Sequence, residues 1–137
     1  MDKKLVALMS LFFVAFLFFT SLIVFKNPLS TVTRAEKATQ PSGANSLLFA
    51  WPLSAKADGQ TEVKVDVFVR SEANGPLENK SVSLNSTLGT VKTLNSSSDK
   101  GGKTTFSLSS STPGIAELSA SIENSTPLTQ KLTIKFE

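Results

Sequence analysis

The side chains that could do chemistry are mostly hydroxyls, because the sequence is rich in Ser and Thr and contains neither His nor Cys. A nucleophilic Ser needs a neighbouring base, and without His or Cys only Lys could act as one. The lack of Cys also excludes disulfides and thiolate metal sites. We therefore predict no catalytic residues, and we interpret the hydroxyls as solvated side chains on strand faces.

Two further patterns resemble ligand sites. Gly102-Lys103-Thr104 matches the end of a phosphate-binding loop, but Ser97 stands where that motif needs Gly, and a strand pattern follows instead of a helix. Acidic residues that could bind calcium lack the Asp-x-Asp spacing; they are Asp58, Asp66, Glu72 and Asp99. We expect a hairpin turn, turn caps and exposed ion pairs here, with no metal and no cofactor.

The overall charge does not indicate a nucleic-acid partner. The formal net charge is +3 and the isoelectric point is about 9.3. Lys and Arg are spread among Asp and Glu, whereas a nucleic-acid surface needs clustered cations with interleaved aromatic residues.

The amino-terminal segment predicts a transmembrane helix over residues 5–25. This run has no charged residue, and roughly 20 apolar residues are enough for a helix to cross a bilayer. A core helix of a soluble protein would show a polar face, which is missing here. Side chains expected in the span include Leu5, Phe12, Phe16, Leu17 and Phe25. The lipid bilayer is the expected partner of this segment.

Residues 1–4 form the expected cytoplasmic end, because they carry Lys3 and Lys4 and have no loop to translocate. We therefore expect the rest of the chain on the extracytoplasmic side. A cleaved signal peptide is the alternative, but its apolar region is usually about 7 to 15 residues long. The best local cleavage site, Thr33-Arg34-Ala35, contains Arg. An uncleaved anchor is the favoured interpretation.

Residues 26–45 are expected to form a flexible linker. No apolar period is present, and Pro, Ser and Gly in Gln40-Pro41-Ser42-Gly43 discourage regular structure.

Residues 46–137 predict an immunoglobulin-like β-sandwich of about seven strands. In the clearest strand, Val63, Val65, Val67 and Val69 alternate with polar residues, which is typical of a half-buried strand. Similar patterns cover 47–53, 82–84, 106–108, 116–122 and 132–136, with Gly and Pro at the turns between them. The predicted core comprises Val65, Val67, Leu84, Phe106, Leu118, Ile134 and Phe136.

Three aromatic residues are candidates for either the core or a ligand. Phe49 and Trp51 share one face of the first strand, which Pro52 marks as an edge strand. Core packing is the favoured role for both, and a ligand platform is the alternative. Phe68 points away from the valines, so it is a candidate for a surface contact or for packing under a loop.

The final two strands suggest a specific register. Pairing their inward residues places Ile122 opposite Leu132, Ala120 opposite Ile134 and Leu118 opposite Phe136. The same register places Glu123 opposite Lys131, with Pro127 in the loop, and it leaves the outer face charged and rich in serine.

The chain resembles the bacterial immunoglobulin-like domain of group 1, the repeat of invasin and intimin type adhesins. The motifs that carry the resemblance, in order along the chain, are Ala57-Asp58-Gly59, Asn74-Gly75-Pro76-Leu77, Lys80-Ser81-Val82-Ser83-Leu84, Leu88-Gly89-Thr90-Val91, Asp99-Lys100-Gly101-Gly102-Lys103-Thr104 and Leu132-Thr133-Ile134-Lys135-Phe136. The resemblance implies a β-sandwich on a cell surface that serves as a spacer or an adhesive module. It carries over no catalytic residues.

These expectations combine into one functional hypothesis. The chain is expected to be a single-pass membrane protein with a surface-exposed, non-enzymatic immunoglobulin-like module that spaces, scaffolds or binds a protein or a glycan. A pilin-like filament subunit is the alternative, although no Gly precedes Leu5 and no acidic residue interrupts the apolar run.

Overall fold

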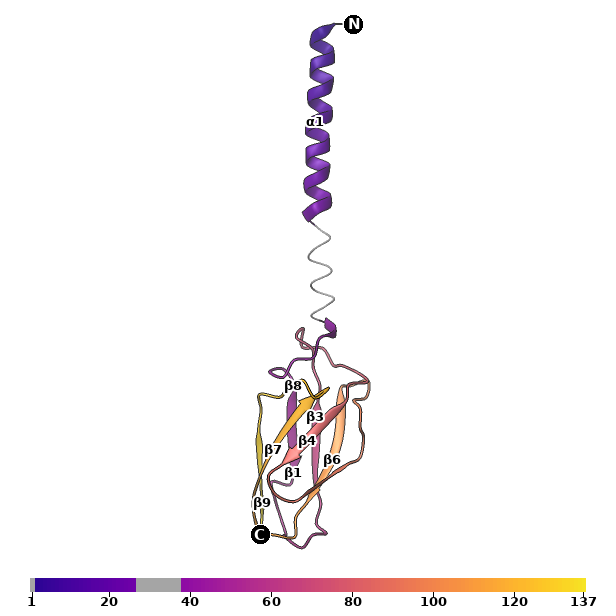
Figure 1. The fold of residues 1–137 in the computed structure, drawn as a ribbon. Coiled ribbons are helices and arrows are strands. Elements are labelled where there is room, and N and C mark those ends of the chain that lie inside the picture. Colours follow the sequence, from indigo (N-terminus) through magenta and orange to yellow (C-terminus); the bar gives the residue numbers. More distant parts are fainter. Residues whose placement is uncertain (1, 27–37) are drawn as a thin grey trace. The chain divides into compact units, whose positions relative to one another are not determined.

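The computed structural model describes residues 2–26 and 38–137, and the side chains of residues 24–26 lie outside that description. It contains two compact units, an amino-terminal helix and a β-sandwich. We describe each unit by itself (Figure 1).

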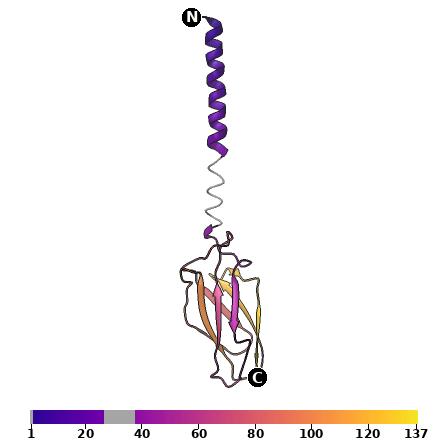
Figure 2. The same ribbon diagram turned by 180° about the vertical axis from the view of Figure 1, so that it is seen from behind.

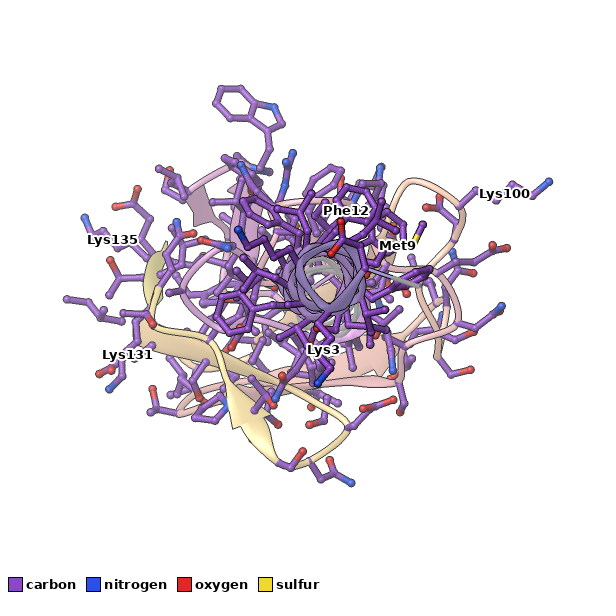
Figure 3. The ribbon with its side chains drawn as sticks, turned by 90° about the horizontal axis from the view of Figure 1, so that it is seen from above. Lys3, Met9, Phe12, Lys100, Lys131 and Lys135 are labelled. Atoms are coloured by element: carbon purple, nitrogen blue, oxygen red, sulfur yellow. The ribbon has the colours of Figure 1, made fainter. Side chains whose placement is uncertain are left out.

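The helix α1 (Lys3–Lys26) is apolar on all sides. Lys3–Ile23 has a mean hydropathy of 2.5, so it is long and apolar enough to cross a membrane. Lys3, Met9 and Phe12 project from the helix axis in different directions (Figure 3). Four of the side chains predicted for the span are exposed along α1, namely Leu5, Phe12, Phe16 and Leu17. The fifth, Phe25, belongs to α1, but its side chain lies outside the described residues.

Two polar side chains in α1 bond within the helix. The Ser10 hydroxyl donates to the Ala7 carbonyl oxygen at 2.9 Å, and the Thr20 hydroxyl donates to the carbonyl oxygen of Phe16. Such bonds satisfy hydroxyl groups without a partner outside the helix, so these residues do not interrupt its apolar surface.

The strands of the second unit form two sheets that face each other (Figures 1 and 2). The first is antiparallel, in the order β1 (Leu47–Trp51), β3 (Val63–Phe68), β6 (Lys103–Ser109) and β5 (Thr90–Thr93). The second has the order β2 (Ser54–Ala55), β9 (Leu132–Phe136), β7 (Gly114–Ile122) and β4 (Val82–Ser86), and β8 (Thr126–Pro127) also pairs with β7. Only the pairing of β2 with β9 is parallel within the described sheets.

The core lies between the sheets and follows the predicted alternation. Val63, Val65, Val67 and Val69 have no exposed surface, and the sequence predicted this from their period of two. All seven residues predicted for the core are buried, which confirms that prediction.

The sandwich begins earlier in the chain than expected. The amide of Ser42 donates to the Arg70 carbonyl oxygen at 2.8 Å, and the amide of Thr129 donates to that of Gly43 at 3.0 Å. The expected linker over 26–45 is therefore wrong for residues 40–45, and residues 27–37 lie outside the described part of the chain. Backbone hydrogen bonds hold this segment in place. Such bonds do not depend on side-chain type, so the sequence shows no apolar period that would predict them.

The predicted register of the final strands is also wrong. Leu118 lies opposite Leu132, and Gly114 lies opposite Phe136, which is a shift of four residues from the expected pairing. Ile122 instead pairs with Thr126 of β8 and with Val82 of β4. An even shift keeps every side chain on its original face, so the predicted core residues stay buried in the wrong register as well as in the right one.

The turn after β7 explains this shift. Glu123 and Asn124 have positive φ angles of 50° and 56°, and the Ser125 amide donates to the Ile122 carbonyl oxygen at 3.1 Å. This tight turn lets β8 pair with the end of β7, so β9 starts further along β7. The ion pairs change accordingly, because Glu123 contacts Lys80 at 2.9 Å and Lys131 contacts Glu117 at 2.7 Å.

Candidate binding surface

The outer face of the first sheet combines aromatic and charged side chains. We call it the aromatic face and define it by the outward residues Phe49, Trp51, Lys64, Asp66, Phe68 and Lys103. Residues opposite each other in an antiparallel pair share a face, so the register places them in rows across the sheet. Phe49 is opposite Asp66, and Trp51 is opposite Lys64.

Phe49 and Trp51 are not core residues, which corrects the favoured sequence interpretation. Phe49 is 51% exposed and Trp51 is 80% exposed, whereas Leu48 is completely buried. Every residue of β1 is apolar, so alternation alone cannot decide which of its two faces is buried. Pairing with β3 decides it, because Leu48 lies opposite the inward residue Val67. The edge position that Pro52 predicted for this strand is confirmed.

Phe68 points to the outer face, as its place in the alternation indicated. It is half-buried, and its ring makes an edge-to-face contact with Phe49 at a centroid distance of 5.9 Å and an angle of 80°. The ammonium nitrogen of Lys103 lies 5.9 Å from the centre of the Phe68 ring. Phe68 therefore packs against the side chain of Phe49. Its role in a surface contact stays a prediction.

Asp66 organises the charged side of the aromatic face. Its Oδ1 atom accepts a hydrogen bond from the Thr105 hydroxyl at 2.9 Å. Its Oδ2 atom lies 3.1 Å from the Lys103 ammonium and 3.7 Å from that of Lys64. The side chain of Asp66 is 21% exposed, while that of Lys64 is 59% exposed. One carboxylate thus pairs closely with Lys103 and more loosely with Lys64, which remains accessible.

A shallow hollow of about 420 Å³ lies within the aromatic face. Phe49, Ala50 and Trp51 of β1 line one side, and Lys64 and Asp66 of β3 line the other. One wall is therefore aromatic and the other carries an ammonium and a carboxylate group. Sequence reasoning missed this site because it assigned two of the aromatic residues to the core.

The open edge of β1 is partly blocked. The Leu48 amide donates to the side-chain oxygen Oε1 of Gln130 at 3.0 Å. A strand that added to this edge would have to displace Gln130, so the accessible surface at β1 is the face rather than the edge.

The other ligand-like motifs are structural. Gly102 has a φ angle of 78°, and its amide donates to the Asp99 carbonyl oxygen at 2.8 Å, which confirms the expected hairpin turn before β6. The Asp99 carboxylate accepts from the amides of Gly101 and Lys103 in the same turn. Within residues 2–26 and 38–137, no three acidic side chains group closely enough to hold a metal ion.

Asp58 caps the turn that precedes β3. Its carboxylate accepts bonds from the amide of Thr61 at 2.6 Å, the hydroxyl of Thr61 at 2.7 Å and the amide of Gln60 at 2.8 Å. These bonds, those from Thr61 above all, lower the pKa of Asp58 to about 2. The turn-cap interpretation of Asp58 is therefore confirmed.

The outer face of the second sheet is polar. The hydroxyl oxygens of Ser83 and Ser121 lie 2.7 Å apart, and Lys131 donates to Glu117 at 2.7 Å. That bond and the charge of Glu117 raise the pKa of Lys131. Lys131 and Lys135 both project away from the sandwich (Figure 3). Ile115 is the exposed large apolar residue of this sheet, at 68%. The predicted serine-rich, charged outer face is present despite the different register.

The sequence of the sandwich identifies its family. The model of the bacterial Ig-like domain (group 1) matches residues 45–136. The chain belongs to this family. Both the resemblance noted in the sequence and the predicted immunoglobulin-like sandwich are thus confirmed.

Solved structures of adhesins are similar to this bacterial Ig-like domain. The adhesin InvE of Yersinia pseudotuberculosis is 28% identical with a TM-score of 0.62, and the match covers 71% of this chain and 27% of InvE. A C-terminal fragment of intimin, solved with the intimin-binding domain of the translocated intimin receptor, is 26% identical with a TM-score of 0.54. That match covers 66% of this chain and 32% of the fragment. Invasin, described as a bacterial integrin-binding protein, shares the fold with a TM-score of 0.66 at 21% identity, over 72% of this chain and 20% of invasin.

The chain thus spans about a fifth to a third of these adhesin structures. No curated protein sequence shows significant similarity to it.

Proposed function

We propose that this protein is a single-pass membrane protein that displays one bacterial Ig-like domain on the extracytoplasmic side as a non-enzymatic module for adhesion or scaffolding. The observation that carries the proposal is the combination of an apolar α1 with a domain of the invasin and intimin type. The bilayer is the partner of α1, and a protein or glycan is the partner of the domain.

The chemistry of α1 supports a membrane position. Its described apolar side chains are exposed, and burying each Leu or Phe in the bilayer centre favours insertion by roughly 0.3 to 0.6 kcal/mol. Between Leu5 and Phe25 no charged residue opposes insertion. Lys3 and Lys4 favour a cytoplasmic amino terminus.

The relatives support a binding role on a surface. Intimin contacts a receptor domain in its solved complex, and invasin is described as integrin-binding. The part that these adhesins share with this chain is the Ig-like domain, and the relatives are adhesins rather than enzymes. This supports a non-enzymatic role here. The whole adhesins are longer, so their particular receptors are not carried over to this chain.

Membrane attachment can be tested by extraction. We expect the full chain to remain with membranes in alkaline carbonate, and we expect Leu17→Arg to impair insertion and lower the retained fraction, because Arg near the helix centre costs about 2.5 to 3.5 kcal/mol. Lys100→Arg on the sandwich is the control and should change nothing. Extraction of the unaltered chain, or a mature amino terminus after Phe25, would favour the secreted alternative.

Orientation can be tested by labelling, because the chain has no native Cys. Lys100→Cys places a single thiol on the sandwich, where the Lys100 side chain extends away from the ribbon (Figure 3). We expect an impermeant maleimide to label this variant in intact spheroplasts and to label Asp2→Cys only after lysis. The reverse pattern would overturn the proposed topology.

A further inference from the structure

We propose that the hollow in the aromatic face binds one pyranose ring of a neutral glycan, with Trp51 as the stacking platform and Lys64 and Asp66 as hydrogen-bonding groups. This inference names a ligand class for the module and rests on the proposed surface role. It depends on the contacts within β1 and β3 and not on the position of α1.

The exposure of Trp51 indicates a binding role. An indole that is 80% exposed contributes little to folding, because the hydrophobic effect stabilises only surface that is removed from water. The exposed ring is flat, large and rigid, and such residues supply much of the binding energy at recognition sites. The C–H groups along one face of a pyranose ring can pack on the indole, which has a negatively polarised face.

The wall opposite Trp51 has the polar groups that a sugar needs. Lys64 has three N–H donors, and its distance of 3.7 Å from Asp66 leaves it weakly held. Asp66 has about four acceptor positions, and contacts with Thr105, Lys103 and Lys64 occupy three. Neighbouring hydroxyl groups of a sugar both donate and accept, so they match a donor beside an acceptor.

The lining of the hollow carries one ammonium group, Lys64, and one carboxylate, Asp66, and Lys103 pairs with Asp66 at 3.1 Å from outside that lining. An anion in the hollow would be attracted by Lys64 but would also meet the carboxylate of Asp66. A hydroxylated ring satisfies both groups and also covers the aromatic wall.

The dimensions agree with a small ligand. A hollow of about 420 Å³ is near the lower end of the range for small-molecule sites, roughly 300 to 1,000 Å³. The edge-to-face contact of Phe49 with Phe68 fixes part of the aromatic wall, and the bond from Thr105 fixes Asp66. Phe49 and Asp66 are therefore positioned before the ligand arrives, which lowers the entropic cost of binding.

Trp51 also provides the readout, because it is the only Trp in the chain. The experiment titrates the full chain in nanodiscs with oligosaccharides built from hexoses, N-acetylhexosamines, uronic acids or sialic acids. We expect a saturable change in tryptophan emission with at least one neutral class and none with inorganic phosphate. Calorimetry with the same sugar measures affinity for the variants.

Two variants and two controls locate the site. We expect Trp51→Ala and Lys64→Ala to weaken binding by at least about tenfold. Ile115→Ala removes an exposed apolar residue from the second sheet, and Lys131→Ala removes an exposed ammonium group there, so both should bind like the unaltered chain. Circular dichroism of each variant checks that the sandwich is folded.

Several outcomes would overturn the inference. The inference is wrong if no oligosaccharide changes the tryptophan emission, or if only anionic sugars do. It is also wrong if Ile115→Ala loses as much affinity as Trp51→Ala, or if Trp51 responds only to a protein without glycans. Membrane extraction and labelling are measured separately. A chain that stays in the membrane but binds no sugar would refute only this inference, and a chain that binds sugar after release would refute only the anchor.

Discussion

The two outer faces of this sandwich lie over the same core but differ in chemistry. On the first sheet, Phe49 and Trp51 are exposed beside the Asp66 carboxylate, which lies 3.1 Å from Lys103 and 3.7 Å from Lys64. On the second, Ser83 and Ser121 form a polar pair, and Glu117 pairs with Lys131 in solvent. The core constrains mainly the inward residues of each strand, so the outward residues can differ in chemistry between the two sheets. The first sheet therefore carries the residues of the proposed binding site.

The largest expected effect separates the inner from the outer side of β3. We expect Val67→Asp to unfold the sandwich or to cost at least about 3 kcal/mol, because Val67 is completely buried and the new charge would have no partner. Lys64→Asp on the outer side of the same strand should cost much less. Urea unfolding followed by circular dichroism measures both, and equal losses would contradict the assignment of the two sides.

A smaller effect compares the ion pairs of the two outer faces. We expect Asp66→Asn to reduce the free energy of unfolding by about 1 to 2 kcal/mol, because Asp66 is mostly buried and accepts three contacts. Glu117→Gln on the other face should have little effect, since the side chain of Glu117 is 47% exposed and that of Lys131 is 65% exposed. If Glu117→Gln proved the more destabilising change in thermal melts, the aromatic face would not be the better organised one.

Adjacent residues of β6 offer a subtler comparison. The Thr104 hydroxyl is buried without a hydrogen-bond partner among the described residues, so Thr104→Val should stabilise the sandwich by about 1 kcal/mol. Thr105→Val should instead destabilise it by a similar amount, because the Thr105 hydroxyl donates to Asp66. Chemical denaturation resolves the two signs, and the same sign for both would be inconsistent with their placement on opposite faces.

The smallest effect concerns pH and the turn before β3. The pKa of Asp58 is lowered to about 2 from its ordinary value of 3.8, so its carboxylate stabilises the fold above pH 4, and this contribution is lost as the pH falls toward 2. Asp58→Asn should therefore melt slightly below the unaltered chain at pH 7, with a difference that shrinks between pH 4 and 2. A constant difference across this range would show that the charge of Asp58 is not responsible.

Much of the fold follows from local patterns in the sequence. The alternation of Val63, Val65 and Val67 with polar residues predicts a half-buried strand, and Pro52 predicts that β1 lies at an edge. The uncharged run after Lys4 predicts α1, because a helix satisfies its own backbone groups and needs no other element. The turn-forming Gly and Asp residues likewise act over a few neighbours, so their roles could be predicted.

Only the tertiary structure decided the features that depend on pairing. The five apolar residues of β1 have two equivalent faces, and contact with β3 selected Leu48 for the core and left Trp51 in solvent. Register is similar, because an even shift preserves burial, and the turn at Glu123 and Asn124 chose among the allowed shifts. Residues 40–45 are held against the sandwich by backbone hydrogen bonds. The backbone groups that form them are present in almost every residue, so side-chain types do not predict them. The sequence by itself therefore determined which elements form and which side of most strands is buried. Long-range pairing determined the candidate site, because that site exists only where the outward residues of β1 and β3 meet.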